Sequence, residues 1–305
     1  MTTTAFGDHS PILARVDAVD GRPSTTYRQA GDTSLLVEFG EMEFELVLNF
    51  VALGLDDALS ADPIPGVTET APGFRSVLIR YDTDTVTPLE LVEELERRCA
   101  RLPPPGATDA PSRLIRLPIT FDDSQSTAAI ARYIHSIRAD APNCVGGNNI
   151  DYIVAYNGFT DRQQFYDAVL GTEQWTAFVG FFPGLPFMVP VDPRRIVVAP
   201  KYNPTRTRTA EGGVGLGGPC YAIYPVEAAG GYQMFGRSLP VYSLNGSNAV
   251  FKQNPLLLRP GDRVKFEPVE EAELMELWED VRADRYVYDI QDSPFDVGAY
   301  LNWLE

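Results

Sequence analysis

The sequence predicts an α+β protein in which a small N-terminal α/β domain precedes a β-rich domain and a short C-terminal helical tail. Strand-like and helix-like runs alternate over residues 33–102, and a proline run then interrupts the chain at residues 103–105. From residue 175 onward, short apolar runs alternate with glycine and proline turns. The 305 residues are enough for about two domains of 100–200 residues each.

The N-terminal region is predicted to contain strand, helix, strand and helix in that order. Residues 33–39 are β-rich, and residues 41–59 carry apolar side chains at helical spacing. Residues 62–73 contain three prolines and two glycines, which predicts a loop. Residues 76–81 form the next β-rich run. Together these runs indicate a small α/β unit.

A capping box marks the start of the second predicted helix. Thr87 is the expected N-cap, Pro88 occupies the first helical position, and Glu90 completes the box. The prolines at 103–105 and the following Gly106 end this helix and predict a linker. We therefore expect three segments: an N-terminal α/β domain at 1–106, a β-rich domain at 107–269, and a C-terminal helix and tail at 270–305.

The second domain is expected to open with one strand and several helices before its β-rich part. The strand covers residues 113–121, and the helical patterns cover about 127–138, 148–157 and a short stretch from 160. Beyond Trp175, the regular spacing of strands and turns favours a barrel or a sandwich. Its later runs include two expected strands and a strand-turn-strand segment, at 196–199, 222–224 and 256–266.

The charge balance excludes several classes of partner. The chain has 42 acidic and 25 basic residues, for a net charge of −17. A nucleic-acid-binding protein needs a basic surface, and an anionic membrane would repel this chain. No apolar run approaches the 18 residues of a membrane span, and residues 1–9 do not resemble a signal peptide. We expect a cytoplasmic protein.

The chain offers little material for a metal site. Its three cysteines, Cys99, Cys144 and Cys220, lie far apart, and it has only two histidines, His9 and His135. Transition-metal sites usually draw on clustered cysteine and histidine ligands. We therefore expect reduced thiols and no transition metal. Cys220 lies in a β-rich run and is expected to act as a small buried side chain rather than a nucleophile.

The segment 201–237 holds the candidate site. It is rich in glycine, which lets backbone approach a ligand, and it contains one of only three lysines. Cationic and amide donors suit a carboxylate or a developing oxyanion. The expected catalytic residues are Lys201, Arg206 and Arg208. The expected substrate-binding residues are Asn203, Glu211, Tyr232, Gln233 and Arg237.

Two local expectations follow for the arginines. Arg206 and Arg208 lie two residues apart on a predicted strand, which places them on the same side. If they bind a ligand, their loss should weaken binding and leave folding nearly unchanged. The alternative is that both belong to a solvated strand face. The glycines at 215–218 do not indicate a nucleotide loop, because a proline and another β-run follow them instead of a helix.

The apolar segment at 181–188, which reads FFPGLPFM, has two interpretations. It is either core and barrel rim or the apolar wall of a ligand pocket.

The candidate segment resembles the allophanate hydrolase subunit 1 family, one half of the carboxyltransferase region of urea carboxylase. The resemblance is carried by Asp192-Pro193-Arg194, by residues 201–207, by the glycine-rich 213–218, and by Gly230-Gly231-Tyr232-Gln233 with Gly236-Arg237. It extends to residues 31–39, 72–76, 117–119 and 293–301, and so covers nearly the whole chain. The family is similar to the B subunit of 5-oxoprolinase and to a sporulation-kinase inhibitor.

The resemblance implies a fold, a reaction and partners. The fold is a small α/β domain followed by a cyclophilin-like β-barrel. The reaction is carboxyl transfer to a nitrogen of a urea- or amide-like substrate, carried out together with a homologous subunit 2-type chain or domain. The resemblance implies that a separate carrier supplies biotin and that this chain binds no cofactor of its own.

This sequence departs from the family pattern at three places in the segment. Arg208 stands where the family has a tryptophan and looks more like the oxoprolinase branch. Ala210 replaces a proline, and Ala228-Ala229 replaces a glycine-proline pair. Two alternatives therefore stay open: a stand-alone enzyme on the same barrel acting on a bulkier ligand, and a regulatory binding protein without catalysis.

Overall fold

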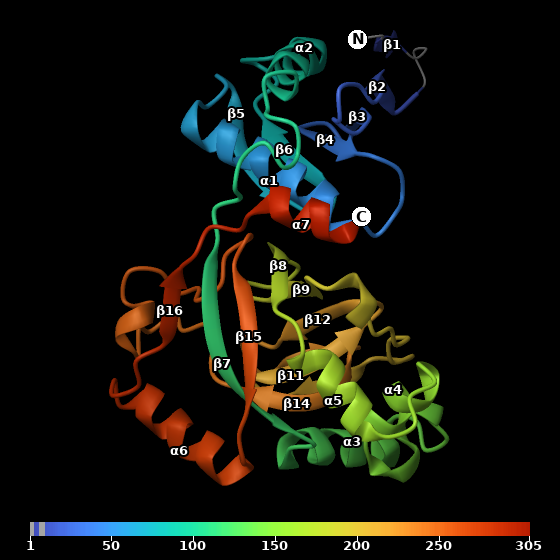
Figure 1. The fold of residues 1–305 in the computed structure, drawn as a ribbon, viewed down its shortest axis with the longest axis vertical. Coiled ribbons are helices and arrows are strands. Elements are labelled where there is room, and N and C mark those ends of the chain that lie inside the picture. The colour runs from blue at the N-terminus through green and yellow to red at the C-terminus, as the bar shows by residue number, and fades with distance from the viewer. Residues whose placement is uncertain (1–2, 6–9) are drawn as a thin grey trace. The chain divides into compact units, whose positions relative to one another are not determined.

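A computed structural model describes residues 3–5 and 10–305, so His9 lies outside the described residues. The chain divides into two compact units (Figure 1). The N-terminal unit comprises the residues up to Pro111 together with Pro294–Glu305, and the barrel unit comprises Ser112–Ser293. The segment expected as a separate C-terminal piece, 270–305, is thus shared between the two units.

The N-terminal unit is a six-stranded antiparallel sheet with two helices packed on it. The strand order is β1-β2-β3-β4-β6-β5. These strands are β1 (Thr3–Ala5), β2 (Ile12–Val16), β3 (Thr25–Gln29), β4 (Ser34–Phe39), β5 (Val67–Pro72) and β6 (Ser76–Tyr81). Alternate residues of β4 and β6 are buried and form a core with α1 (Leu46–Ala61) and α2 (Pro88–Cys99).

Two sequence predictions in this unit have opposite outcomes. The capping box is confirmed, since the Thr87 side chain accepts from the Glu90 amide and the Glu90 carboxylate accepts from the Thr87 amide at 3.0 Å. The predicted loop at 62–73 is wrong in its second half, where β5 forms. An edge strand tolerates proline because only one of its sides is paired, and β5 pairs with β6 alone.

The barrel unit is built on a closed seven-stranded barrel. The order around the barrel is β14-β11-β12-β9-β8-β15-β7, and β14 pairs back with β7. β7 and β15 are parallel and all other neighbours are antiparallel. The strands are β7 (Arg113–Phe121), β8 (Gln174–Val179), β9 (Pro186–Pro190), β11 (Gly213–Gly217), β12 (Cys220–Ile223), β14 (Gln233–Ser238) and β15 (Arg263–Pro268). The predicted α+β class with a β-barrel is confirmed.

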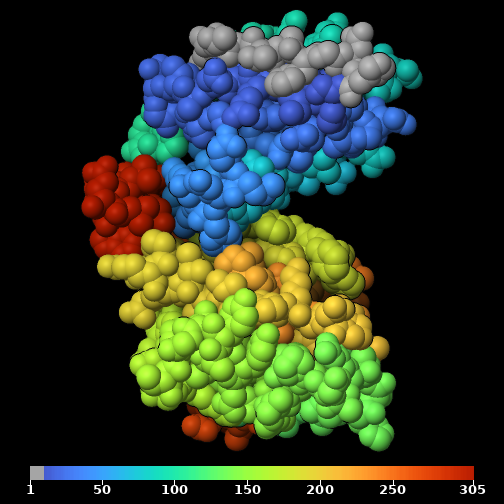
Figure 2. Space-filling model, turned by 90° about the vertical axis from the view of Figure 1, so that its right-hand side faces the viewer, coloured from blue at the N-terminus to red at the C-terminus, as the bar shows by residue number. Residues whose placement is uncertain are grey.

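Smaller elements surround the barrel. β16 (Asp289–Asp292) pairs with the first residues of β7, and β10 (Arg206–Thr209) pairs with β13 (Ala228–Gly230) as a separate ribbon. The helices are α3 (Ser124–Ser136), α4 (Ile150–Tyr156), α5 (Arg162–Leu170) and α6 (Glu271–Arg282), and α7 (Val297–Leu304) belongs to the N-terminal unit. Figure 2 shows α3, α4 and α5, in green, on the surface of the barrel unit.

The barrel interior is a packed core rather than a channel. Ile115, Leu117 and Ile119 of β7 meet Val214 and Leu216 of β11, and all are fully buried. Two strands predicted from apolar runs are absent. Each of the two segments, 196–199 and Leu256–Leu258, makes only one isolated bridge. Val197, Ala199, Leu257 and Leu258 are buried in the core but lie in loops.

Candidate functional site

An apolar cavity of about 290 Å³ opens on the barrel unit beside β9, β12 and β13. Its walls are mainly aromatic and aliphatic, and its polar lining comes from the loop that begins at Lys201. A concave, largely apolar hollow with a few polar groups is the usual form of a small-molecule site. The apolar wall consists of Phe181, Leu185, Phe187, Ala222, Tyr224 and Tyr232.

Glycines make this wall possible. An added Cβ at Gly217 would overlap the ring of Tyr232, and one at Gly230 would overlap the ring of Tyr224. Both tyrosine rings therefore lie close against the backbone of these glycines. The Phe187 ring meets the Tyr232 ring edge-on, with centroids 6.2 Å apart. The glycines of segment 201–237 thus shape a cavity wall instead of a phosphate loop.

Lys201 supplies the positive charge of the cavity. Its Nζ lies 5.3 Å from the centroid of the Tyr232 ring, and it makes no ion pair with any residue among 3–5 and 10–305. The other two lysines are engaged: Lys252 pairs with Asp284 at 2.5 Å, and Lys265 donates to a backbone carbonyl. Lys201 is therefore available to bind an anionic ligand.

A buried amide pair supports the loop that carries Lys201. Gln233 is 1% exposed, and its side chain donates to the Pro200 carbonyl at 2.6 Å. It also accepts from the Asn143 side chain at 3.0 Å. Both polar atoms of Gln233 are thus used within the protein, and Gln233 does not line the cavity. Its position fixes the backbone immediately before Lys201.

Asn149 holds the next residue of the same loop. It is fully buried, and its side-chain oxygen accepts from the Tyr202 hydroxyl at 2.8 Å and from the Met234 amide at 2.9 Å. Burial raises the pKa of Tyr202, so its hydroxyl remains a donor. The loop is consequently anchored on both sides of Lys201 by buried hydrogen bonds.

Arg206 lies beneath the site and does not line it. It is 1% exposed, donates to the Tyr232 carbonyl at 2.5 Å and to the Thr209 hydroxyl at 3.1 Å, and stacks on the Tyr202 ring. No carboxylate of the described residues pairs with it, and its Nε has no hydrogen-bond partner. The alternative of a solvated Arg206 is wrong, because this guanidinium is enclosed by Tyr202 and the β10–β13 ribbon.

Arg208 and Asn203 lie at the surface. Arg208 forms an ion pair with Glu227 at 2.6 Å, and its side chain is 43% exposed. The expectation that Arg206 and Arg208 share a side is wrong. A register shift within β10 leaves residues 206 and 209 buried and residue 208 exposed. Asn203 is exposed, and its backbone oxygen accepts from Arg138 at 2.9 Å.

Glu211 and Arg237 belong to a separate cluster. Arg237 lies four residues from Gln233 on β14, a separation of about 13 Å along a strand. Its guanidinium donates to the Glu211 carbonyl at 3.0 Å and stacks on Trp278. Burial raises the pKa of Glu211 and lowers that of Arg237. Neither residue lines the cavity.

The apolar segment 181–188 supplies both core and pocket wall. Met188 is fully buried in the barrel core, whereas Phe181, Leu185 and Phe187 line the cavity. Cys220, on the neighbouring strand, is half-buried, and burial raises its pKa to about 11. Such a thiol stays protonated near neutral pH and is a poor nucleophile.

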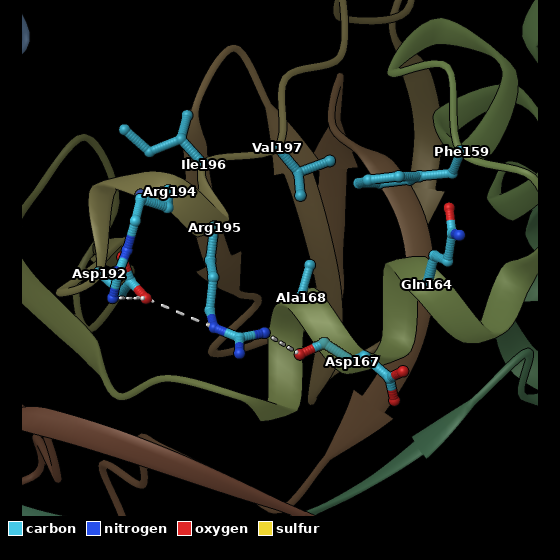
Figure 3. Close-up of a pocket in the computed structure, with 9 residues that line it drawn as sticks. All are labelled: Phe159, Gln164, Asp167, Ala168, Asp192, Arg194, Arg195, Ile196 and Val197. Carbon is cyan, nitrogen blue, oxygen red and sulfur yellow. Dashed lines mark hydrogen bonds and ion pairs between the residues drawn. The ribbon is translucent and has the colours of Figure 1, made fainter.

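A second hollow, of about 560 Å³, is polar and open (Figure 3). Its charged groups are already engaged: Arg194 donates to Asp192 through two nitrogens, and Arg195 donates to the Asp167 carbonyl at 2.8 Å. These contacts brace the short helix at Pro193–Arg195 and leave little charge for a ligand. The family motif Asp192-Pro193-Arg194 therefore has a structural explanation.

The described residues hold neither a metal-binding cluster nor a membrane-spanning helix. No cluster of three or more His, Cys, Asp or Glu side chains in residues 3–5 and 10–305 could hold a metal ion. No described helix is long and apolar enough to cross a membrane.

Sequence reasoning missed Asn143, Asn149 and the individual importance of Phe181. The asparagines lie at the two ends of the stretch NCVGGNN, which carries no catalytic spacing, so no signal distinguishes them from loop residues. Phe181 was included only as part of an apolar run.

The comparisons with known proteins agree with this geometry. The family model described as carboxyltransferase domain, subdomain C and D, matches residues 25–251. The chain belongs to this carboxyltransferase domain family. The resemblance predicted from the sequence is thereby confirmed.

The relatives are parts of larger enzymes or enzyme subunits. Urea amidolyase of Saccharomyces cerevisiae is 36% identical over 300 residues, which cover 97% of this chain and 16% of that protein. The B subunit of 5-oxoprolinase from Bacillus subtilis is 25% identical, covering 80% of this chain and 93% of the relative. This carboxyltransferase-family chain spans about a sixth of the length of the urea amidolyase that it matches.

Solved structures show the same fold. The K. lactis urea amidolyase structure matches with a TM-score of 0.88 at 35% identity, over 96% of this chain and 18% of that one. The urea carboxylase of Kluyveromyces lactis matches with a TM-score of 0.87 at 34% identity, over 97% of this chain and 26% of that one. The chain is thus homologous to the carboxyltransferase part of urea carboxylase.

Proposed function

We propose that this chain is one half of a carboxyltransferase that moves an activated carboxyl group from biotin to the nitrogen of a urea- or amide-like substrate. The observation that carries the proposal is Lys201. It is an unpaired ammonium among the described residues, it borders an apolar cavity, and its loop is held by buried amides. The proposed carboxyltransferase-type domain is the barrel unit.

The cavity residues fit a biotin ring. Aromatic and aliphatic walls at Phe187, Tyr224 and Tyr232 suit the apolar faces of a bicyclic ring, and a cation at the border suits a carboxylate. Bound biotin, supplied by a separate carrier, would provide the activated carboxyl group. A homologous subunit 2-type chain or domain would complete the site.

Within this proposal each residue of the chain has a distinct task. The Lys201 ammonium binds the carboxylate and stabilises negative charge that develops during transfer. The Tyr232 ring excludes water from one face of the cavity and keeps the ammonium close by a cation–π contact. Asn203, exposed on the same loop, would donate to the urea- or amide-like substrate.

Five residues that the sequence predicted at the site act differently in this proposal. Gln233 and Arg206 are positioning residues, because their polar groups hold Pro200 and Tyr232. Arg208, paired with Glu227, lies at the surface and has no assigned role in transfer. Glu211 and Arg237 stabilise the β14–α6 side of the barrel unit.

The test is carboxyl transfer in the assembled enzyme. The chain is combined with a homologous second half and a biotinylated carrier loaded with labelled carboxyl. Label in the carboxylated product is counted after separation from the carrier at alkaline pH, because an N-carboxylated urea or amide loses carbon dioxide in acid. Lys201→Met keeps the apolar stem and removes the charge. Loss of one charge-assisted contact should lower kcat/KM by about ten- to a hundredfold. Lys252→Met is the matched control, since Lys252 pairs with Asp284 away from the cavity.

Transfer by Lys201→Met at the wild-type rate would overturn the role of Lys201. Efficient turnover of a bulkier apolar ligand by the chain alone would favour the stand-alone enzyme. The apolar lining of the cavity is the observation that keeps this second candidate open.

A further inference from the structure

Phe181 combines two unfavourable features at the mouth of the cavity. Its φ is +64°, in the left-handed region that bulky L-residues avoid. Its side chain is 95% exposed, so a large apolar ring faces water. It lies at the tip of the β8–β9 hairpin. A strained, solvent-facing aromatic residue that lines a cavity is a marker of function rather than of folding.

The hairpin itself does not need a phenylalanine at this position. The turn is closed by backbone hydrogen bonds from Gly180 to Leu185 at 3.1 Å and from Leu185 to Phe182 at 3.0 Å. A glycine at position 181 could adopt the same φ without strain. The turn therefore does not explain the ring of Phe181.

The surroundings of Phe181 indicate what its ring contacts. Two other aromatic rings of this wall contact each other: Phe187 meets Tyr232 with ring centroids 6.2 Å apart, and Phe187 is also stacked on Phe178 behind it at 4.4 Å. Phe181 has no ring partner within residues 3–5 and 10–305, yet it lines the same cavity. One side of the cavity wall is thus an aromatic face that is open to a ligand.

We propose that the Phe181 ring stacks on the planar ureido ring of bound biotin and closes the outer side of the cavity. This inference rests on the proposed function. Urea is small and polar and gains little from aromatic walls, so the apolar part of the cavity suits the carrier's ring and not the acceptor. Phe181 is then a ligand-contacting residue that selects a flat, partly apolar ring.

The experiment measures binding of biocytin, the biotin–lysine conjugate, by calorimetry, with the chain and no transfer reaction. Phe181→Ala and Phe181→Gly should each weaken biocytin binding by about tenfold through the lost stacking. Leu244→Ala is the control, because Leu244 is 76% exposed on the barrel unit and does not line the cavity. Thermal melts separate folding from binding: Phe181→Gly should melt at or above the wild type, because it relieves the positive φ.

The outcomes distinguish this inference from the proposed function. If both Phe181 variants bind biocytin with the affinity of the wild type, the role of Phe181 is overturned and the proposed function still stands. Wild-type affinity for biocytin combined with lost transfer from the protein-linked carrier also overturns it, since the ring then contacts the carrier protein. A wild-type chain that binds no biocytin overturns the assignment of the cavity to biotin and, with it, this inference.

Discussion

Replacing Arg206 with alanine should destabilise the barrel unit strongly. The guanidinium is 1% exposed and donates to the Tyr232 carbonyl and the Thr209 hydroxyl. It also stacks on the Tyr202 ring, with 4.3 Å from its central carbon to the ring centroid. Its removal leaves two buried acceptors with fewer partners, loses a cation–π contact and opens a void. These terms together predict a loss of about 3–5 kcal/mol in the free energy of unfolding.

The assay is urea unfolding of Arg206→Ala beside Arg208→Ala. The exposed Arg208–Glu227 pair should contribute at most about 1 kcal/mol, so its loss serves as the matched control. For a unit of about 180 residues, 3 kcal/mol corresponds to a fall in Tm of about 6–12 °C. An Arg206→Ala variant that unfolds like the wild type but binds ligand more weakly would refute this reasoning. That result would restore the direct ligand contact expected from the sequence.

Two further predictions concern the cavity wall and the Glu211 cluster. Gly217→Ala should cost about 1–3 kcal/mol in urea unfolding, because the new methyl group overlaps the Tyr232 ring; Gly54→Ala, where the methyl group meets nothing within 4 Å, is the control and should not destabilise. Glu211→Gln should raise Tm at pH 7. Burial raises the pKa of Glu211 above its ordinary 4.5. The free energy of unfolding of the wild type therefore falls as pH rises from that ordinary value through the raised pKa. The advantage of Glu211→Gln should vanish near pH 4, and an advantage that grows on acidification would contradict the burial argument.

Local signals in the sequence predicted local structure well. The capping box at Thr87 depends on residues within one turn, so it could be recognised directly. The barrel class followed from the spacing of turns and from the family resemblance. Pairing between strands far apart in the sequence, such as β14 with β7, leaves no mark in the local pattern. β5 was missed for a different reason: the prolines and glycines of residues 62–73 are typical of a loop, although the next strand, β6, offers β5 a pairing partner.

The candidate site was predicted in part, for a comparable reason. The composition of segment 201–237 pointed to Lys201 and Tyr232, which do meet at the cavity. The alternation rule failed for Arg206 and Arg208, because a one-residue irregularity in β10 is invisible in the sequence. Asn149 and Tyr202 are 53 residues apart in the sequence. No local sequence pattern predicts a contact between residues at that separation.

The return of the last residues to the N-terminal unit has a consequence for biosynthesis. Phe295 and Tyr300 pack against Phe50, with ring centroids 5.6 and 5.8 Å away, and Phe295 exchanges backbone hydrogen bonds with Ala110. On the ribosome, the N-terminal sheet emerges before the barrel unit, and the whole barrel must be translated before these partners arrive. A nascent chain stalled before Pro294 would present an incomplete N-terminal unit, with part of its apolar surface open to chaperones.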